Sequence, residues 1–388
     1  MKRLALVTTH PIQYNAPLFK LLGQRQKVQI KVFYTWGQSV QSAKYDPGFG
    51  KKIEWDIPLL DGYEHSFVKN ISQNPGSSHF KGIINPTLIK EIEEWKADVV
   101  LVYGWAFQSH LKCIRYFHKK IPVLFRGDST LLDEQKGIKK ILRRLFLKWV
   151  YRHIDYALYV GTNNKKYFLA NGIKNKQLIY VPHAIDNNRY AASDAQYESE
   201  AALWRIEMGI DASDLVILFA GKFEDKKQPA VLLELAKKIP DKRLKFILVG
   251  NGILENELKT AAQNDSRIFF IDFQNQQRMP VVYRLGNVFI LPSKGPGETW
   301  GLAINEAMAC NRPVIISDKV GCSDDLVKNN INGVIFDTGS LDSVIVFIKQ
   351  LLINPALLKI MGMDSKRIIQ DFSFQQVVVA IENLVSCI

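Results

Sequence analysis

Two glutamates beside one glycine-rich loop are the side chains best suited to chemistry on a hydroxylated ligand. Glu298 and Glu306 stand eight positions apart in the segment from Leu291 to Ile315, which reads as strand, Gly/Pro loop, helix and strand. A carboxylate accepts two hydrogen bonds, so it suits a sugar hydroxyl or a ribose diol. Gly297 and Gly301 let the backbone pass close to a ligand, and a helix starting near Gly301 would aim N–H groups at a diphosphate. The alternative is that Glu306 is a solvated helix residue and Glu298 an N-cap.

A second segment, from Phe219 to Pro229, supplies positive charge. Gly221 ends an apolar run, and Lys222 and Lys227 follow it on the loop toward the next helix. Two ammonium groups at that place would neutralise the charge that develops on a diphosphate leaving group. An ordinary solvated charge run is the alternative. Gly250 follows the next apolar run and marks a tight loop at the same edge of the predicted sheet.

The elements that must position these side chains alternate between strand-like and helix-like runs. Most strand-like runs are continuously apolar, which is typical of parallel strands covered on both faces. The polar stretch 186–213 separates two sets of such runs and predicts a domain boundary. Two doubly wound α/β domains in tandem would face a cleft, with the carboxyl ends of their strands toward it. The expected strands are 4–8, 28–34, 98–103, 122–125, 156–160, 216–220, 245–249, 268–271, 288–291 and 313–317, with loops at 38–50 and 72–82.

Length and composition fit a globular protein of two domains. The chain has 388 residues, 47% hydrophobic and 23% charged, and a domain takes roughly 100–200 residues. None of the four cysteines has zinc-ligand spacing, so we expect a reduced, cytoplasmic setting. The sequence contains no run of 18 apolar residues, so we expect no membrane span. The net charge of +13 leaves nucleic acid, an anionic membrane surface and anionic substrates open as partners.

Together these segments resemble the retaining glycosyltransferases of family 4, which have the GT-B fold. ETWGLAINE matches the family's E-x7-E pattern, FAGKFEDKKQP is similar to its G-R-L-x-x-x-K segment, and YVPHAID resembles its V-P-N-G-V-D linker. LVGNG and NGVIF follow in the family's order, so the resemblance covers nearly all of the second half. It implies two Rossmann-like domains, 1–188 for the acceptor and 189–369 for the nucleotide sugar. The last helix, within 370–388, would cross back onto the first domain.

The resemblance also implies a role for each donor-side residue. Glu306 would bind the ribose hydroxyls, and Glu298 would contact the donor sugar near its C3 as a catalytic residue. Lys222 and Lys227 would bind the phosphates. The family retains the anomeric configuration and needs neither a metal nor a cofactor. The backbone amides that would hold the diphosphate and the sugar are those of Thr299, Trp300, Gly301 and Leu302.

The sequence departs from the family pattern at several positions. Lys222 replaces the usual arginine, which keeps the charge but loses the bidentate fork. THPIQYNAP stands where the family often has a Gly-Gly loop, and Arg126 stands at the position of its N-domain histidine. We expect Arg126 to stabilise the departing phosphate or to contact the acceptor. Acceptor-side positions are predicted at His10, Gln13, Tyr14 and Asp128, with a merely structural role as the alternative for His10 and Asp128.

Residues 136–153 form a predicted basic amphipathic helix, KGIKKILRRLFLKWVYRH. Apolar residues recur at helical spacing between seven basic ones. Such a helix can lie on an anionic membrane, which predicts peripheral contact with the inner face of the cell membrane. A helix packed on the core with a basic outer face is the alternative.

The leading hypothesis is therefore a glycosyltransferase that moves a UDP- or GDP-linked sugar to a glycan or a lipid-linked acceptor in polysaccharide or glycolipid assembly. A relative with other chemistry, such as a sugar-phosphate synthase or a nucleotide-sugar epimerase, is the second. A basic nucleic-acid-binding protein is the third, but no aromatic-basic RNA motif or helix-turn-helix pattern supports it. We accordingly expect no nucleic-acid partner.

Overall fold

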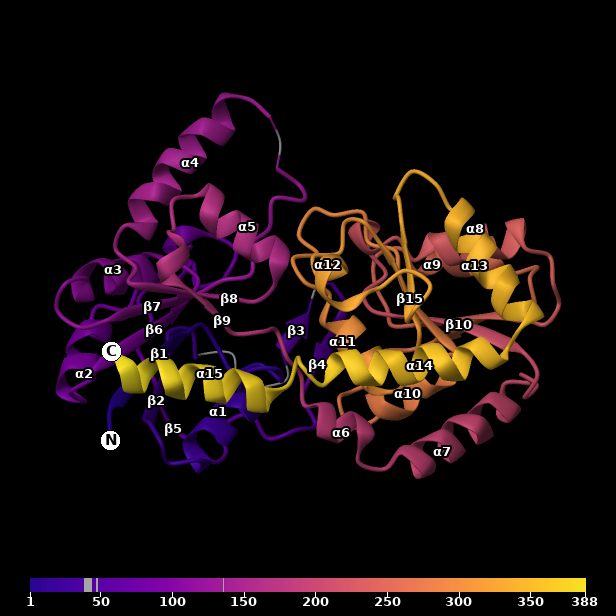
Figure 1. The fold of residues 1–388 in the computed structure, drawn as a ribbon, viewed down its shortest axis with the longest axis horizontal. Helices are drawn as coiled ribbons and strands as arrows, with labels where there is room; N and C mark the ends of the chain where they lie inside the picture. The colour runs from indigo at the N-terminus through magenta and orange to yellow at the C-terminus, as the bar shows by residue number, and fades with distance from the viewer. Residues whose placement is uncertain (38–43, 47, 135) are drawn as a thin grey trace. The chain divides into compact units, whose positions relative to one another are not determined.

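The computed structural model describes residues 1–37, 44–46, 48–134 and 136–388, and these form two compact units (Figure 1). Unit 1 contains residues 1–44, 57–183 and 374–388. Unit 2 contains residues 45–56 and 184–373. Each unit is built around one parallel sheet with its own buried core.

The sheet of unit 1 has seven strands in the order β5-β2-β1-β6-β7-β8-β9, all parallel. Its central strands are fully buried and apolar, because helices cover both faces. The strands are β1 (Arg3–Thr8), β2 (Gln29–Tyr34), β5 (Glu64–Phe67), β6 (Val99–Tyr103), β7 (Val123–Arg126), β8 (Tyr156–Tyr159) and β9 (Leu178–Tyr180). The helices of this unit are α1 (Ala16–Gln24), η1 (Phe80–Gly82), α2 (Leu88–Glu94), α3 (Gln108–Phe117), α4 (Ile138–Tyr151), α5 (Thr162–Ala170), η2 (Asn175–Gln177) and α15 (Phe374–Cys387).

The sheet of unit 2 has six parallel strands in the order β12-β11-β10-β13-β14-β15. This is the strand order of a Rossmann fold, in which the direction of winding reverses between the first and fourth strands. The strands are β10 (Leu215–Ala220), β11 (Leu244–Val249), β12 (Ile268–Ile271), β13 (Val288–Leu291), β14 (Val314–Ser317) and β15 (Gly333–Phe336).

The helices of unit 2 pack around this sheet, and a short separate sheet joins β3 (Lys44–Asp46) to β4 (Lys51–Ile53). The helices are α6 (Asn187–Ala191), α7 (Asp194–Glu207), η3 (Asp225–Lys227), α8 (Ala230–Lys238), α9 (Glu255–Ala262), α10 (Met279–Leu285), α11 (Leu302–Ala309), α12 (Ser323–Leu326), α13 (Asp342–Ile353) and α14 (Ala356–Ile369).

These two parallel-sheet units confirm the predicted fold class of two Rossmann-like α/β domains. The division between the units differs in detail from the predicted one, because it falls after His183 and assigns residues 45–56 to unit 2. The prediction of a loop at 38–50 is wrong for residues 44–46, which form strand β3. Residues 38–43 and 47 of that predicted loop lie outside the described residues.

The last helix, α15, belongs to unit 1 and runs beside α1 (Figure 1). Arg25 follows α1 and donates to both carboxylate oxygens of Glu382, at 2.7 and 3.0 Å. The Glu382 side chain is 3% exposed, so this bidentate pair fixes the helix in a largely dry environment.

A buried histidine joins the carboxyl ends of three neighbouring strands in unit 1. The Nδ1 atom of His110 lies 3.0 Å from the carbonyl oxygen of Tyr103, and its Nε2 atom lies 2.9 Å from Oγ1 of Thr35. Thr35 also donates to the carbonyl oxygen of Thr8. Burial lowers the pKa of His110 to about 4, although the backbone carbonyls favour the charged form.

The stability of the protein should therefore fall on acidification through His110. Its pKa is about 6.5 in an unfolded chain, so the unfolded state takes up a proton first and the contribution is lost as the pH falls from 6.5 toward 4. Between pH 7 and pH 5 we expect a loss of about 2 kcal/mol in the free energy of unfolding. Urea unfolding at pH 7 and pH 5 should show a loss of stability that is smaller by about this amount in His110→Gln than in the wild type. An exposed-site control, His79→Gln, should keep the wild-type loss, and an unchanged loss in His110→Gln would contradict the assignment.

Within the described residues, no single helix is long and apolar enough to cross a membrane. By length and composition alone, α13 and α14 pass that test as a pair, bent by 117° at their junction.

Candidate active site

The predicted donor residues of unit 2 gather at the point where the winding of its sheet reverses. Lys222 follows β10, and the loop that carries Glu298 follows β13; these two strands are neighbours in the sheet. In open α/β sheets, ligands bind outside the carboxyl ends of the strands at this switch point. The topology therefore brings together two segments that lie about 70 residues apart in sequence.

Glu298 is held by two groups from different loops. Lys227, at the end of η3, forms an ion pair with Oε2 of Glu298, and the Oγ of Ser293 donates to the same oxygen at 2.9 Å. The side chains of Lys227 and Glu298 are 21% and 11% exposed, respectively. The residue predicted for the phosphates and the residue predicted for the sugar are thus in direct contact.

The helix behind this loop begins where the sequence predicted. Gly301 precedes α11 and has a φ of +94°, the left-handed conformation that favours glycine. A Cβ atom at Gly301 would lie 2.7 Å from the Val320 side chain, so glycine is also required by packing. The backbone N–H of Gly321 donates to the carbonyl oxygen of Glu298 at 3.0 Å. A Cβ atom at Gly321 would meet the carbonyl oxygen of Thr299, so a second glycine fixes the same loop.

Glu306 is buried, which rules out the solvated alternative. It is 2% exposed and accepts a hydrogen bond of 2.5 Å from the hydroxyl of Tyr283 on α10. A buried carboxylate needs such donors, because leaving it without them costs free energy. Sequence reasoning missed Tyr283, since nothing in the spacing of the two residues along the chain connects them.

Replacing Tyr283 with phenylalanine should weaken both the fold and the donor site. The hydroxyl donates to a buried carboxylate, so its loss should cost about 2 kcal/mol of unfolding free energy. The donor KM should rise about tenfold if Glu306 binds the ribose as predicted. Tyr116→Phe is the matched control, because its hydroxyl donates to Glu93 at 2.6 Å on the exposed surface of unit 1. Equal effects in the two variants would contradict the special role of Tyr283.

Local packing explains why glycine and tryptophan occupy two of the predicted donor-side positions. Gly250 has a φ of +137°, and a Cβ atom there would lie 2.0 Å from the carbonyl oxygen of Gly221. The two strand-to-helix loops therefore pack backbone against backbone. Trp300 is 3% exposed, donates to Asn305 at 2.8 Å and packs near Phe372. Its side chain lies in the core, so its predicted contribution is that of its backbone amide.

A residue from the N-terminal part of the sequence covers Lys222. Phe49, between β3 and β4, lies with its ring 5.0 Å from the Nζ atom of Lys222 and 4.8 Å from the ring of Phe273. Asn275 and Gln277, which follow β12, donate to the backbone carbonyls of Glu54 and Asp56. No pattern in the sequence indicated that this segment belongs to the donor-side unit.

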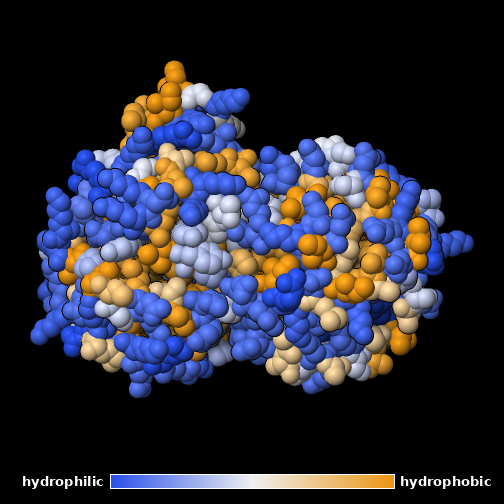
Figure 2. Space-filling view, in the orientation of Figure 1, coloured by the Kyte–Doolittle hydropathy of each residue, from blue (hydrophilic) through white to orange (hydrophobic). Residues whose placement is uncertain are grey.

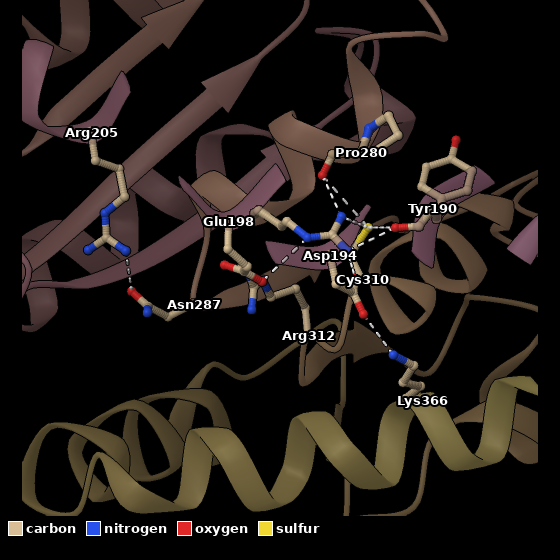
Figure 3. Close-up of polar contacts among 10 residues, drawn as sticks. Tyr190, Asp194, Glu198, Arg205, Pro280, Asn287, Cys310, Arg312 and Lys366 are labelled. Atoms are coloured by element: carbon tan, nitrogen blue, oxygen red, sulfur yellow. Dashed lines mark hydrogen bonds and ion pairs between the residues drawn. The ribbon is translucent and has the colours of Figure 1, made fainter. Parts of the chain in front are cut away.

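An ion-pair network anchors α10, the helix that carries Tyr283 (Figure 3). Arg284 has no exposed side-chain surface and donates to the carbonyl oxygens of Tyr190 and Pro280, each at 2.8 Å. It also pairs with Asp194 and Glu198 of α7, which in turn bind Lys366 and Arg312. Burial alone would raise the pKa of Asp194, but the hydrogen bond from Lys366 and the charge of Arg284 hold it below its ordinary value. The network thus fixes α10 against α6 and α7.

In unit 1, Arg126 is a buried residue at the end of β7. Its guanidinium donates to the carbonyl oxygens of Val181 and Pro182, at 2.8 and 3.0 Å. These contacts tie β7 to the segment that leaves the unit, which is a structural function. Its predicted role toward the phosphate or the acceptor stays a prediction.

Asp128 lies close to a histidine that sequence reasoning had not singled out. The Nε2 atom of His183 is 3.6 Å from Oδ2 of Asp128. Burial lowers the pKa of His183, and Asp128 only partly offsets that effect. The YVPHAID segment places His183 where the resembled linker has asparagine, and that difference was the signal available in the sequence.

The predicted acceptor-side residues after β1 are half-buried: His10, Gln13 and Tyr14. His10 packs edge-on against Trp36, with the ring centroids 5.3 Å apart, and its Nδ1 atom lies 3.0 Å from the hydroxyl of Thr9. They follow a central strand at the reversal point between β1 and β6 of the unit 1 sheet. Across the described ranges, no group of three His, Cys, Asp or Glu side chains is arranged to hold a metal ion.

Comparison with known proteins identifies the part of the chain that carries the donor-side residues. The family model of glycosyl transferases group 1 matches residues 201–367. A D-inositol 3-phosphate glycosyltransferase of Rhodococcus jostii is 28% identical over 207 residues, 50% of this chain and 45% of the relative. The UDP-Gal:alpha-D-GlcNAc-diphosphoundecaprenol alpha-1,3-galactosyltransferase of Escherichia coli is 28% identical over 173 residues, 42% of each chain. The chain thus spans less than half the length of these two curated relatives.

The fold extends beyond the matched segment. The crystal structure of Anabaena HepE in complex with UDP matches with a TM-score of 0.73 and 17% identity, over 100% of both chains. This likeness confirms the two-domain GT-B fold class. All the predicted donor-side residues lie within 201–367, the part of the chain that the family model of glycosyl transferases group 1 matches.

Proposed function

We propose that the protein transfers a sugar from a nucleoside diphosphate to a glycan or lipid-linked acceptor, with retention at the anomeric carbon and without a metal ion or other cofactor. The observation that carries the proposal is the contact between Lys227 and Glu298 at the switch point of the unit 2 sheet. A cation for the phosphates and a carboxylate for the sugar hydroxyls are then in direct contact. The buried Glu306, with Tyr283 behind it, supplies the second carboxylate for the ribose.

The donor is a UDP- or GDP-linked sugar, and the assignment to the retaining family 4 rests on the E-x7-E segment. The names of the relatives support a donor and an acceptor of this kind. The Escherichia coli relative is named for UDP-galactose and a diphosphoundecaprenol-linked acceptor. A lipid-linked acceptor is consistent with action at the cytoplasmic face of a membrane.

A panel of nucleotide sugars tests the donor assignment. A ligand that binds only the folded state stabilises it by about 2.7 kcal/mol at a hundred times its Kd. We expect a UDP- or GDP-sugar to raise the melting temperature and the matching sugar phosphate alone to have little effect. If no nucleotide sugar raises the melting temperature, the proposal is wrong.

Product analysis tests the chemistry. Transfer to an acceptor should give a glycoside with the anomeric configuration of the donor, seen by NMR, and should continue in EDTA. Turnover of the nucleotide sugar without any acceptor would instead indicate an epimerase. A product with inverted configuration would remove the assignment to the retaining family.

A further inference from the structure

Helix α4 (Ile138–Tyr151) carries apolar residues on a face that the fold leaves uncovered. Ile138 is 75% exposed, Leu142 is 61% exposed, and Ile141 and Leu145 are each 59% exposed. Their spacing of three and four residues places them on one side of the helix. In Figure 1, α4 projects from the rest of unit 1, and Figure 2 shows hydrophobic residues gathered on that projection.

This face is distinct from the one that packs on the protein. Leu147, Val150 and Tyr151 are buried in the core of unit 1. They lie about half a helical turn away from the exposed residues. The alternative interpretation from the sequence, a single apolar face turned to the core, therefore holds only for the last turns of α4. The first turns expose a second apolar face, and contiguous exposed apolar surface marks an interaction site.

The charge around the exposed face has one sign. Residues 136–152 include seven basic side chains and no acidic one. Lys139 and Arg143 are exposed along one flank of α4, whereas Lys140 and Arg144 pair with Glu134. An apolar helix face accompanied by exposed cations is complementary to a surface that has an anionic outer layer and an apolar interior.

Other occupants of this face fit less well. A second copy joined by a symmetric contact would bring the same basic residues against each other. Nucleic acid would satisfy the cations but leave four aliphatic side chains against water. An anionic lipid bilayer accommodates both the aliphatic side chains and the cations, since the former enter the acyl region while lysine and arginine reach the phosphates.

We propose that α4 lies in the surface of an anionic lipid bilayer, with Ile138, Ile141, Leu142 and Leu145 among the acyl chains and Lys139 and Arg143 at the lipid phosphates. This contact is separate from sugar transfer, because it lies on unit 1 and involves none of the donor-side residues. It would hold the protein where a lipid-linked acceptor is found.

Binding of the full-length protein to vesicles of phosphatidylcholine with phosphatidylglycerol tests the proposal. We expect sedimentation with these vesicles, little with pure phosphatidylcholine, and weaker binding as salt screens the charges. The variant I141S/L142S/L145S should reduce the apparent affinity at least about tenfold, and so should K139E/R143E. The melting temperature and the response to nucleotide sugars should stay as in the wild type in both variants.

Helix α7 (Asp194–Glu207) provides the matched control. Leu203 and Ile206 are 59% and 68% exposed on it, but its charged residues are mostly acidic. L203S/I206S should bind vesicles as the wild type does. The proposal is overturned if the α4 and α7 variants bind vesicles equally well, or if the wild type does not bind anionic vesicles at low salt. It is also overturned if light scattering shows a dimer that the α4 substitutions dissociate without any effect on vesicle binding.

Discussion

Replacing Glu298 with alanine should lower the rate of sugar transfer at least about a hundredfold while the protein stays folded. Groups that contact charge developing in the transition state commonly contribute this much to the rate. Glu298 sits at the switch point of the unit 2 sheet, held by Lys227 and Ser293. Its removal would leave the donor sugar without its carboxylate and would also release Lys227 from its ion pair. The effect should therefore appear mainly in kcat, measured with the donor and acceptor that the panel identifies.

A control variant separates this effect from a general loss of charge. Glu234 forms an exposed ion pair with Lys238 on α8, and Glu234→Ala should leave transfer unchanged. The melting temperature of Glu298→Ala should stay within a few degrees of the wild type. Near-normal transfer by Glu298→Ala would show that the carboxylate does not serve the reaction.

Replacing Arg284 with methionine should destabilise the protein by about 3 kcal/mol. The substitution preserves much of the side-chain volume but leaves the carbonyl oxygens of Tyr190 and Pro280 without their charged donor. It also removes one cation from Asp194 and Glu198, but these carboxylates are 33% and 46% exposed and keep Lys366 and Arg312 as partners, so most of the cost comes from the two buried carbonyl oxygens. Because Tyr283 is the neighbouring residue on α10, donor affinity should fall as well.

Arg205→Met is the comparison for this experiment. Arg205 lies on α7 and donates to Asn287 at 3.4 Å and to the carbonyl oxygen of Asp214 at 3.0 Å (Figure 3). It is half-buried, so its loss should cost about 1 kcal/mol. Urea unfolding of both variants checks the difference. A similar cost in the two variants would mean that the Arg284 network does not anchor α10.

The sequence predicted the central strands of both sheets because they are buried on both faces and hence continuously apolar. It did not predict β5 (Glu64–Phe67), an edge strand that is exposed at both end residues and half-buried between them, so that no apolar run marks it. Strand β9 was missed for the same reason, since its three residues are half-buried or exposed.

The donor-side loops were readable because their glycines and charged residues lie close together along the chain. The contacts that complete them were not readable, since Tyr283, Lys227 and Phe49 reach Glu306, Glu298 and Lys222 through the fold. Arg126 shows the opposite case. Its match to the position of the resembled family's N-domain histidine suggested chemistry, and in the structure its guanidinium binds backbone carbonyls of the adjoining segment.

The path of the chain between the two units bears on how the protein is made. Unit 2 includes residues 45–56, more than a hundred positions before its main part begins at residue 184, and unit 1 includes α15 near the chain's end. During synthesis, unit 1 must therefore wait for residues 374–388 to leave the ribosome before Arg25 can meet Glu382. Domains generally fold as units while the chain emerges, but here neither one is contiguous. Cutting the gene at residue 183 would separate Phe49 from Lys222 and α15 from α1, so each half made alone would lack a segment on which its own packing depends.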